Sequence, residues 1–138
     1  MVALSRPERG PGTKGHEDLQ SDFRVETHTT GRVTTLTVGG ELDLLSSPAL
    51  DQELERAHAS DCDVILIDLR ELEFMDSTGL HVLVKAHQRE HDSGRSLVLT
   101  KGGEQVQRLL DLTGVAELIK IVDSPAQLVQ ADRARDPS

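Results

Sequence analysis

Apolar residues in the first patterned part of the chain recur at every second position. Residues 23–28 (FRVETH) and 32–40 (RVTTLTVGG) alternate apolar and polar side chains and are rich in β-branched residues, a pattern typical of strands. Thr30 and Gly31 separate the two runs. Because a short turn that contains glycine commonly joins two antiparallel strands, we expect a hairpin here.

Beyond residue 40, segments with a helical period alternate with short apolar runs. Residues 64–69 (VILIDL) are almost continuously apolar, as expected for a central strand covered on both faces. Leu80, Leu83 and Val84 recur at the spacing of one helix face. The sequence predicts helices over 46–60, 77–94, 102–114 and 124–131, and further strands over 64–69, 96–100 and 118–122. This order indicates one α/β domain, with a mixed sheet of about five strands and about four helices.

The two ends of the chain lack this patterning. Residues 1–21 are rich in proline, glycine and charged residues and poor in aliphatic ones, so we expect a disordered arm. Residues 132–138 (DRARDPS) are equally polar and are expected to fray. The folded domain is therefore predicted over residues 22–131.

Composition and charge narrow the classes of partner. The 138-residue chain has a formal net charge of −9, and its only Phe, Trp or Tyr residues are Phe23 and Phe74. Without a basic stripe or aromatic platforms, nucleic acid and anionic membranes are poor partners, and a basic protein surface is a better one. Cys62 is the single cysteine, which suits a reducing compartment. No apolar run resembles a secretory signal or a membrane span, so we expect a cytoplasmic protein.

A polar stretch, Asp76-Ser77-Thr78-Gly79, separates the central strand from the helix that follows. In one interpretation the Ser77 oxygen caps this helix by accepting a hydrogen bond from a backbone amide. In another, the Ser77 hydroxyl is exposed and accepts a phosphate, which would add about −1.5 to −2 charges beside Asp76. The residue pattern by itself leaves both interpretations open.

Residues 40–43 (GELD) and 64–83 (VILIDLRELEFMDSTGLHVL) resemble the STAS domain of bacterial anti-anti-sigma factors, which are also called anti-sigma factor antagonists. The order of elements fits over nearly all of residues 22–131, and DSTGL is the most specific motif. The resemblance implies that Ser77 is the phosphorylated residue, with Asp43, Asp76, Thr78 and Gly79 as its neighbours. Of the residues near this site, we expect the following to contact the partner: Asp43, Met75, Asp76 and Leu80.

The resemblance also implies a switch between partners. The unphosphorylated protein would bind an anti-sigma factor that is itself a serine kinase, and would thereby release a sigma factor. Phosphorylation of Ser77 would break this complex, and a PP2C-type phosphatase would restore the free hydroxyl. ATP and Mg²⁺ would belong to the kinase, so we expect no cofactor and no enzymatic activity in this chain. We expect it to be a monomer or a weak dimer.

Three other activities are compatible with parts of the sequence. His87 and His91 fit the H-x-x-E-H pattern of one zinc peptidase class, but the sequence nominates no third ligand, and we expect no metal site. Asp68 could be the phospho-acceptor of a receiver-like module, although the first strands lack the acidic pair that such a Mg²⁺ site requires. A nucleophilic role for Ser77 would lack the G-x-S-x-G elbow of serine hydrolases.

Overall fold

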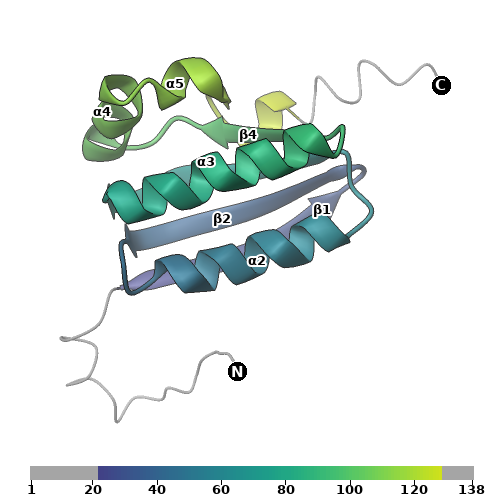
Figure 1. Ribbon diagram of the computed structural model, residues 1–138, viewed down its shortest axis with the longest axis horizontal. Coiled ribbons are helices and arrows are strands. Elements are labelled where there is room, and N and C mark those ends of the chain that lie inside the picture. The colour runs from purple at the N-terminus through teal and green to yellow at the C-terminus, as the bar shows by residue number, and fades with distance from the viewer. Residues whose placement is uncertain (1–21, 129–138) are drawn as a thin grey trace, which may run out of the picture.

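A single five-stranded sheet, in the order β1-β2-β3-β4-β5, organises the chain. The computed structural model describes residues 22–128. The strands are β1 (Phe23–Thr30), β2 (Val33–Leu42), β3 (Val64–Met75), β4 (Ser96–Thr100) and β5 (Lys120–Val122), and the helices are α2 (Ser47–Ala59), α3 (Ser77–Asp92), α4 (Glu104–Leu112) and α5 (Val115–Leu118). In Figure 1, α2 and α3 lie side by side on one face of the sheet. The α/β class and the mixed five-stranded sheet are as predicted.

The predicted hairpin is present at one edge of the sheet. β1 pairs with β2 in antiparallel orientation, whereas β2, β3, β4 and β5 follow one another in parallel. Gly31, in the turn, has a φ of 60°, a left-handed conformation that glycine adopts without steric cost. Among the described strands, β1 is therefore the one antiparallel strand, and it alone makes this sheet mixed.

The main apolar core lies between the sheet and the helices α2, α3 and α4. Ile65 and Ile67 of β3 point into it, and Leu54 of α2 and Leu83 of α3 pack there with no exposed surface. α2 follows β2 and α3 follows the neighbouring parallel strand β3. Both helices consequently begin at the same edge of the sheet, the carboxyl edge of its parallel strands (Figure 1).

A smaller apolar cluster covers part of the opposite face of the sheet. Leu66 of β3 belongs to this cluster, together with Val33, Val98, Val122 and Leu128. Leu128 lies in a helical segment, residues 125–128, at the end of the described chain. Because successive side chains of a strand point to opposite faces, β3 needs apolar residues on both sides. This explains the continuous apolar run that predicted a central strand.

The central strand is longer than the apolar run that predicted it. β3 continues past residue 69 to Met75, through residues 70–73, which include Arg70, Glu71 and Glu73. Its register with β2 shifts between Thr37 and Gly39 and again between Gly40 and Glu41. These irregularities change which residues face the core, so the alternating pattern of a regular strand is lost there.

The predicted boundaries also change near the end of the domain. The strand predicted over 118–122 is shortened to β5 (Lys120–Val122), because residues Val115–Leu118 form the short helix α5. Gly114, with a φ of 83°, directly precedes α5 and separates it from α4. The left-handed glycine ends the longer helix and redirects the chain before the strand can begin.

The predicted arm (residues 1–21) and tail (residues 132–138) lie outside the described residues, as does the end of the helix predicted over 124–131. The boundaries of the domain at 22 and 131 therefore stay predictions. Within residues 22–128, no helix is both long enough and apolar enough to cross a membrane.

Candidate functional site

The candidate site lies where β2 and β3 end side by side. Leu42 and Met75 are partners in the last step of this parallel pairing, and the amide of Asp76 donates to the Leu42 carbonyl oxygen at 3.1 Å. Asp43 directly follows β2, and Asp76 directly follows β3. The register therefore brings these two predicted site residues to neighbouring positions at the carboxyl edge of the sheet, where α/β proteins commonly bind their ligands.

Asp76, and not Ser77, caps α3. Its Oδ1 accepts hydrogen bonds from the amides of Thr78 at 2.9 Å and Gly79 at 3.1 Å. The interpretation in which Ser77 caps the helix is therefore wrong. A capping side chain must precede the amides that it bonds by two or three residues, and Asp76 has that position in this turn. The helix begins without any contribution from the Ser77 hydroxyl.

Ser77 is the first residue of α3, and it is exposed, whereas Thr78 is only partly exposed. Gly79, one residue further on, is buried against the end of β2. A Cβ at Gly79 would lie 2.6 Å from Cγ of Leu42 and 3.1 Å from its carbonyl oxygen. Glycine at this position lets α3 approach β2 closely, and this contact fixes Ser77 beside the loop that contains Asp43.

Asp43 organises the loop between β2 and α2. Its Oδ1 accepts hydrogen bonds from the amides of Leu45 at 3.0 Å and Ser46 at 3.2 Å, which is an Asx turn. Ser46 holds the N-cap position of α2, but its hydroxyl donates to the Glu41 carbonyl oxygen at 2.8 Å instead of bonding a helix amide. The Asp43 carboxylate is therefore held in a fixed position next to the end of β3.

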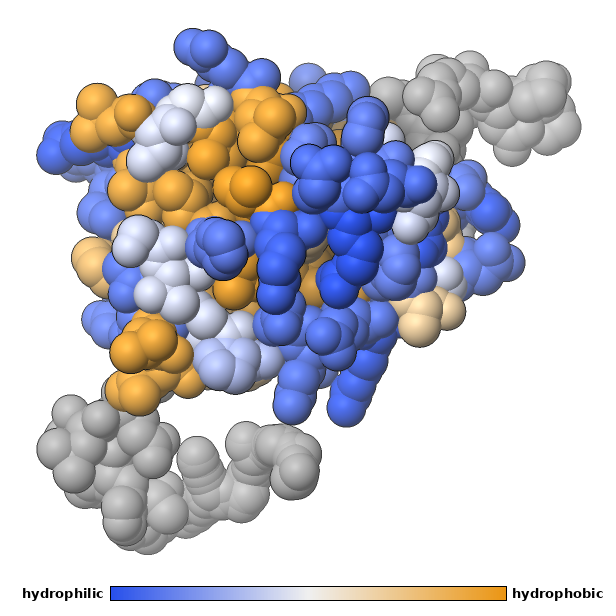
Figure 2. Space-filling model, viewed as in Figure 1, coloured by the Kyte–Doolittle hydropathy of each residue, from blue (hydrophilic) through white to orange (hydrophobic). Residues whose placement is uncertain are grey.

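Two leucines that the sequence analysis did not single out occupy the same loop. Leu44 and Leu45 are each 69% exposed, and Phe74, close to the end of β3, is 39% exposed. Figure 2 shows apolar side chains at this end of the molecule, over the loop between β2 and α2. Exposed apolar groups gathered at one edge are typical of a surface that binds another protein. The available signal was a pair of leucines directly after GELD, outside both the strand pattern and the apolar helix face.

The two apolar residues predicted to contact the partner occupy different environments. Met75 has no exposed surface, so the prediction that it lines a docking surface is wrong. In the irregular last part of β3, Glu73 and Phe74 are both exposed, and Met75 returns to the core. Leu80 is half-buried and packs against the main core, so part of its side chain remains accessible.

Gln105 of α4 is a further residue that sequence reasoning missed. Its Nε2 donates to the Met75 carbonyl oxygen at 2.9 Å, and its Oε1 accepts a hydrogen bond from the Met75 amide at 3.0 Å. β4 pairs with β3 only as far as Ile67, so no neighbouring strand serves Met75 on this side. The side chain of Gln105 replaces the missing strand and fixes the backbone directly before the polar stretch.

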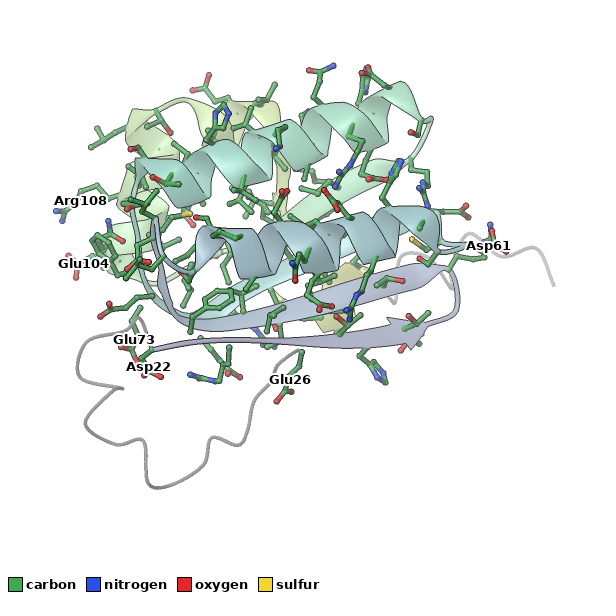
Figure 3. All side chains as sticks on the ribbon, turned by 60° about the horizontal axis from the view of Figure 1, so that its bottom comes forward. Asp22, Glu26, Asp61, Glu73, Glu104 and Arg108 are labelled. Carbon is green, nitrogen blue, oxygen red and sulfur yellow. The ribbon has the colours of Figure 1, made fainter. Side chains whose placement is uncertain are left out.

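Charged residues around this edge are mostly acidic. Glu41 and Glu73 are exposed near the ends of β2 and β3, and Glu104 is exposed at the start of α4. Figure 3 shows Glu73 and Glu104 at the same end of the molecule as Arg108. The Arg108 guanidinium donates a hydrogen bond to the Glu104 carboxylate at 3.4 Å, which partly offsets the negative charge of Glu104. An acidic edge is electrostatically suited to a partner with a basic surface.

Asp68, the phospho-acceptor of the receiver-like alternative, lies inside β3 and is only 3% exposed. Its carboxylate accepts two hydrogen bonds from the Arg70 guanidinium, both at 2.9 Å, and one from the Thr100 hydroxyl at 3.2 Å. Burial opposes ionisation, but the hydrogen bonds from Arg70 and Thr100 outweigh it and hold the pKa of the Asp68 carboxyl below its ordinary value. A buried and ion-paired carboxylate is inaccessible to a phosphodonor, which argues against the receiver-like alternative.

His87 and His91, the residues of the zinc alternative, lie one turn apart on α3. Their rings are stacked, with centroids 6.2 Å apart and planes at 26°. In the part of the chain that the structure describes, no group of three or more His, Cys, Asp or Glu side chains could hold a metal ion. The third ligand that the zinc alternative requires is therefore not supplied by residues 22–128.

Comparison with known proteins extends these observations. A family model described as the STAS domain matches residues 24–128. An anti-sigma-B factor antagonist from Listeria monocytogenes is 36% identical over 84 residues, which are 61% of this chain and 74% of the relative. Another from Staphylococcus aureus is 27% identical over 100 residues, which are 72% of this chain and 93% of the relative.

Solved structures show the same fold. The crystal structure of an anti-sigma factor antagonist from Mycobacterium paratuberculosis matches with a TM-score of 0.75 and 23% identity, over 81% of this chain and 95% of that one. The Bacillus cell fate determinant SpoIIAA, in its phosphorylated form, matches with a TM-score of 0.62 and 18% identity, over 82% of this chain and 99% of that one.

Proposed function

The chain belongs to the STAS-domain family of anti-sigma factor antagonists, and from this premise we propose that Ser77 is its phosphorylation switch. In the proposed cycle, the unphosphorylated protein binds an anti-sigma factor with serine kinase activity and thereby frees a sigma factor. Phosphorylation of Ser77 by that kinase ends the complex. The observation that carries this proposal is the exposed hydroxyl of Ser77 at the start of α3, beside the cap residue Asp76.

Access of a kinase to Ser77 is the first requirement of this proposal. The residue is exposed, and its turn is held by the bonds of Asp76 to α3 and of Gln105 to Met75. A kinase would therefore meet the hydroxyl in one fixed position. Thr78, which is only partly exposed and follows Ser77 into the helix, is the less accessible acceptor.

The effect of the phosphate follows from its surroundings. Phosphorylation would add about −1.5 to −2 charges at an edge that already contains Asp43 and Asp76. Helix amides favour an anion at the start of α3, so the fold can accommodate the modified residue. A partner packed on Leu44 and Leu45 would have to desolvate the phosphate and accept its bulk, which weakens the complex. A loss of about 1.4 kcal/mol already reduces affinity tenfold.

The partner surface that we propose has an apolar and an acidic part. Leu44, Leu45 and the accessible part of Leu80 supply apolar contacts, and Asp43 and Asp76 face basic groups of the kinase. Both carboxylates also hold the backbone of their own turns, so they act partly by shaping the edge. This surface replaces the predicted contact through Met75.

The remaining parts of the cycle belong to other proteins. ATP and Mg²⁺ are held by the kinase, a PP2C-type phosphatase removes the phosphate, and this chain catalyses neither step. We place the cycle in the cytoplasm, where sigma factors meet RNA polymerase. One structural neighbour, SpoIIAA, has been solved in a phosphorylated form, which supports a covalent switch on this fold.

The switch can be tested with the anti-sigma factor kinase from the organism that produces this protein. After incubation with ATP, mass spectrometry should locate an acid-stable phosphate on Ser77 and none on Thr78. Ser77→Ala should bind the kinase as tightly as the unmodified protein and stay bound in the presence of ATP. Ser77→Asp should bind at least about tenfold more weakly. Ser93, an exposed serine after the other end of α3, supplies the matched control Ser93→Ala, which should behave as the unmodified protein. Equal affinities of the Ala and Asp variants at position 77 would refute the switch.

A further inference from the structure

The outer edge of β1 is an unpaired strand edge within the described part of the chain. β1 is the first strand in the sheet order and contacts only β2 through its backbone ladder. It is 8 residues long and contains neither proline nor lysine, two residues that proteins often place on edge strands to prevent further pairing. An open edge of this length is able to accept another strand.

The register with β2 shows which backbone groups face this open edge. The Asp22 carbonyl oxygen accepts a hydrogen bond from the Glu41 amide at 2.9 Å, one step beyond the pairing of Phe23 with Gly40. Because bonded residues alternate along an antiparallel strand, Arg24, Glu26 and His28 are bonded to β2. The backbone groups of Phe23, Val25 and Thr27 consequently point away from the sheet.

We propose that a second copy of this chain occupies the edge, with the two β1 strands antiparallel and Val25 of one copy opposite Val25 of the other. In this register the outward amides and carbonyl groups of Val25 bond to each other, and those of Phe23 bond to those of Thr27. The two sheets join into one continuous sheet about a twofold axis.

The charges of β1 select this register. Arg24 lies opposite Glu26 of the second copy, and the symmetry repeats this pair on the other side of the axis. The next register in one direction places Glu26 opposite Glu26, and the next in the other direction places Arg24 opposite Arg24, and both are repulsive. The register beyond the first places Glu26 opposite His28 and leaves Arg24 opposite Thr30, so Arg24 has no acidic partner there. Figure 3 shows Glu26 projecting from β1 on the side away from α2, where it is accessible to a second copy.

Arg24 already has an exposed partner, which it would exchange. Its guanidinium lies over Gly39 and donates to Glu71 at 3.2 Å, and the two side chains are 51% and 57% exposed. Such exposed pairs contribute little and are readily replaced. One strand pair also buries a small area, so the dimer is expected to be weak and dependent on concentration.

Sedimentation equilibrium of the full chain tests the pairing over a concentration range from about 10 µM to about 1 mM. The unmodified protein should show a monomer–dimer equilibrium. Arg24→Glu or Glu26→Arg alone should raise the dissociation constant at least about tenfold, because each makes two symmetric contacts repulsive. A mixture of the two variants should dimerise again, because every facing pair then has opposite charges.

Two controls separate this result from damage to the fold. Glu71→Gln removes the internal partner of Arg24 without touching the edge, so it should leave the dimer at least as tight. In the unmodified protein, exchange of the Val25 and Thr27 amides should slow as concentration rises, while that of the Glu26 amide, already bonded to β2, should not change. A monomer at every concentration overturns the proposal, as does a dimer whose affinity the charge reversals and their mixture leave unaltered.

Discussion

Gln105 closes both backbone hydrogen bonds of Met75, with distances of 2.9 Å from Nε2 to the carbonyl oxygen and 3.0 Å from the amide to Oε1. One side chain of α4 thereby stands in for a neighbouring strand at the end of β3. Since Met75 directly precedes Asp76 and Ser77, this contact links the position of α4 to the position of the proposed phosphorylation site.

Gln105→Ala should lower the free energy of unfolding by about 2 kcal/mol, because two hydrogen bonds to partly buried backbone groups are lost. Denaturant unfolding measures this change, and amide exchange at Met75 should become faster. The free energy of unfolding of Gln105→Glu should lie between those of the unmodified protein and Gln105→Ala. A carboxylate accepts a hydrogen bond from the Met75 amide but cannot donate one to the Met75 carbonyl oxygen. Arg108→Ala, on the exposed side of the same helix, is the control and should change stability by less than about 0.5 kcal/mol. Equal effects at positions 105 and 108 would contradict the role of the glutamine.

Asp76→Ala should destabilise the protein by about 1 kcal/mol, the usual cost of removing a helix cap. Asp76→Asn, which keeps an acceptor oxygen, should recover most of this loss. Ser77→Ala should leave the unfolding midpoint nearly unchanged, because the hydroxyl bonds no amide of the helix that it begins. Thermal or denaturant unfolding of the three variants distinguishes the neighbouring positions, and a larger loss from Ser77→Ala than from Asp76→Ala would show that the cap has been misassigned.

Gly79→Ala should destabilise the protein by about 1–3 kcal/mol, because the added methyl group meets Leu42 at 2.6 Å and α3 must move away from β2. Such a shift also displaces Ser77, so phosphorylation by the kinase should slow. Gly103→Ala is the matched control: its Cβ would have only the Leu72 carbonyl oxygen nearby, at 3.8 Å. Its effect should stay within about 1 kcal/mol, mainly from replacing glycine at an N-cap. Similar unfolding midpoints for the two variants would argue against a tight contact at Gly79.

Asp68→Asn should destabilise the protein at pH 7 by about 1–3 kcal/mol, because a buried charge-assisted network with Arg70 and Thr100 is weakened. The pKa of the Asp68 carboxyl is lower in the folded protein than its unfolded value of about 3.9, so the unfolded chain binds this proton more tightly. The stabilisation is therefore complete above about pH 5 and is lost as the pH falls through the folded pKa. Between pH 7 and about pH 3, the free energies of unfolding of the unmodified protein and Asp68→Asn should approach each other as the pH falls. A difference that stays constant over this range would contradict this account.

The order of elements was predictable because period and turn residues are local properties. The alternation in β1 and β2, the helical spacing in α3 and the turn at Gly31 each depend on residues close in sequence. The end of β3 was not predictable in this way. Its register shifts with β2 and its closure by Gln105 depend on contacts between distant segments, which leave no periodic signal in residues 70–75.

The polar residues of the candidate site were predictable, but their roles were not, and neither were the exposed leucines of the loop or the contact from Gln105. The sequence placed Asp43, Asp76 and Ser77 together through the family motif, and the strand register brings the two aspartates to neighbouring positions. Which side chain caps α3 depends on the φ and ψ angles of a single residue, Asp76. The burial of Met75 likewise depends on the phase of an irregular strand, which the residue types do not reveal.

The two polar side chains at the beginning of α3 have different roles. Asp76 caps the helix, and the hydroxyl of Ser77 makes no hydrogen bond to its amides. A change at position 77 is therefore expected to leave the stability of the domain nearly unaltered, so the phosphate of the proposed switch would be added and removed on an unchanged scaffold. Such a separation suits a regulatory protein, because the chemical state of one side chain can change while the fold stays the same.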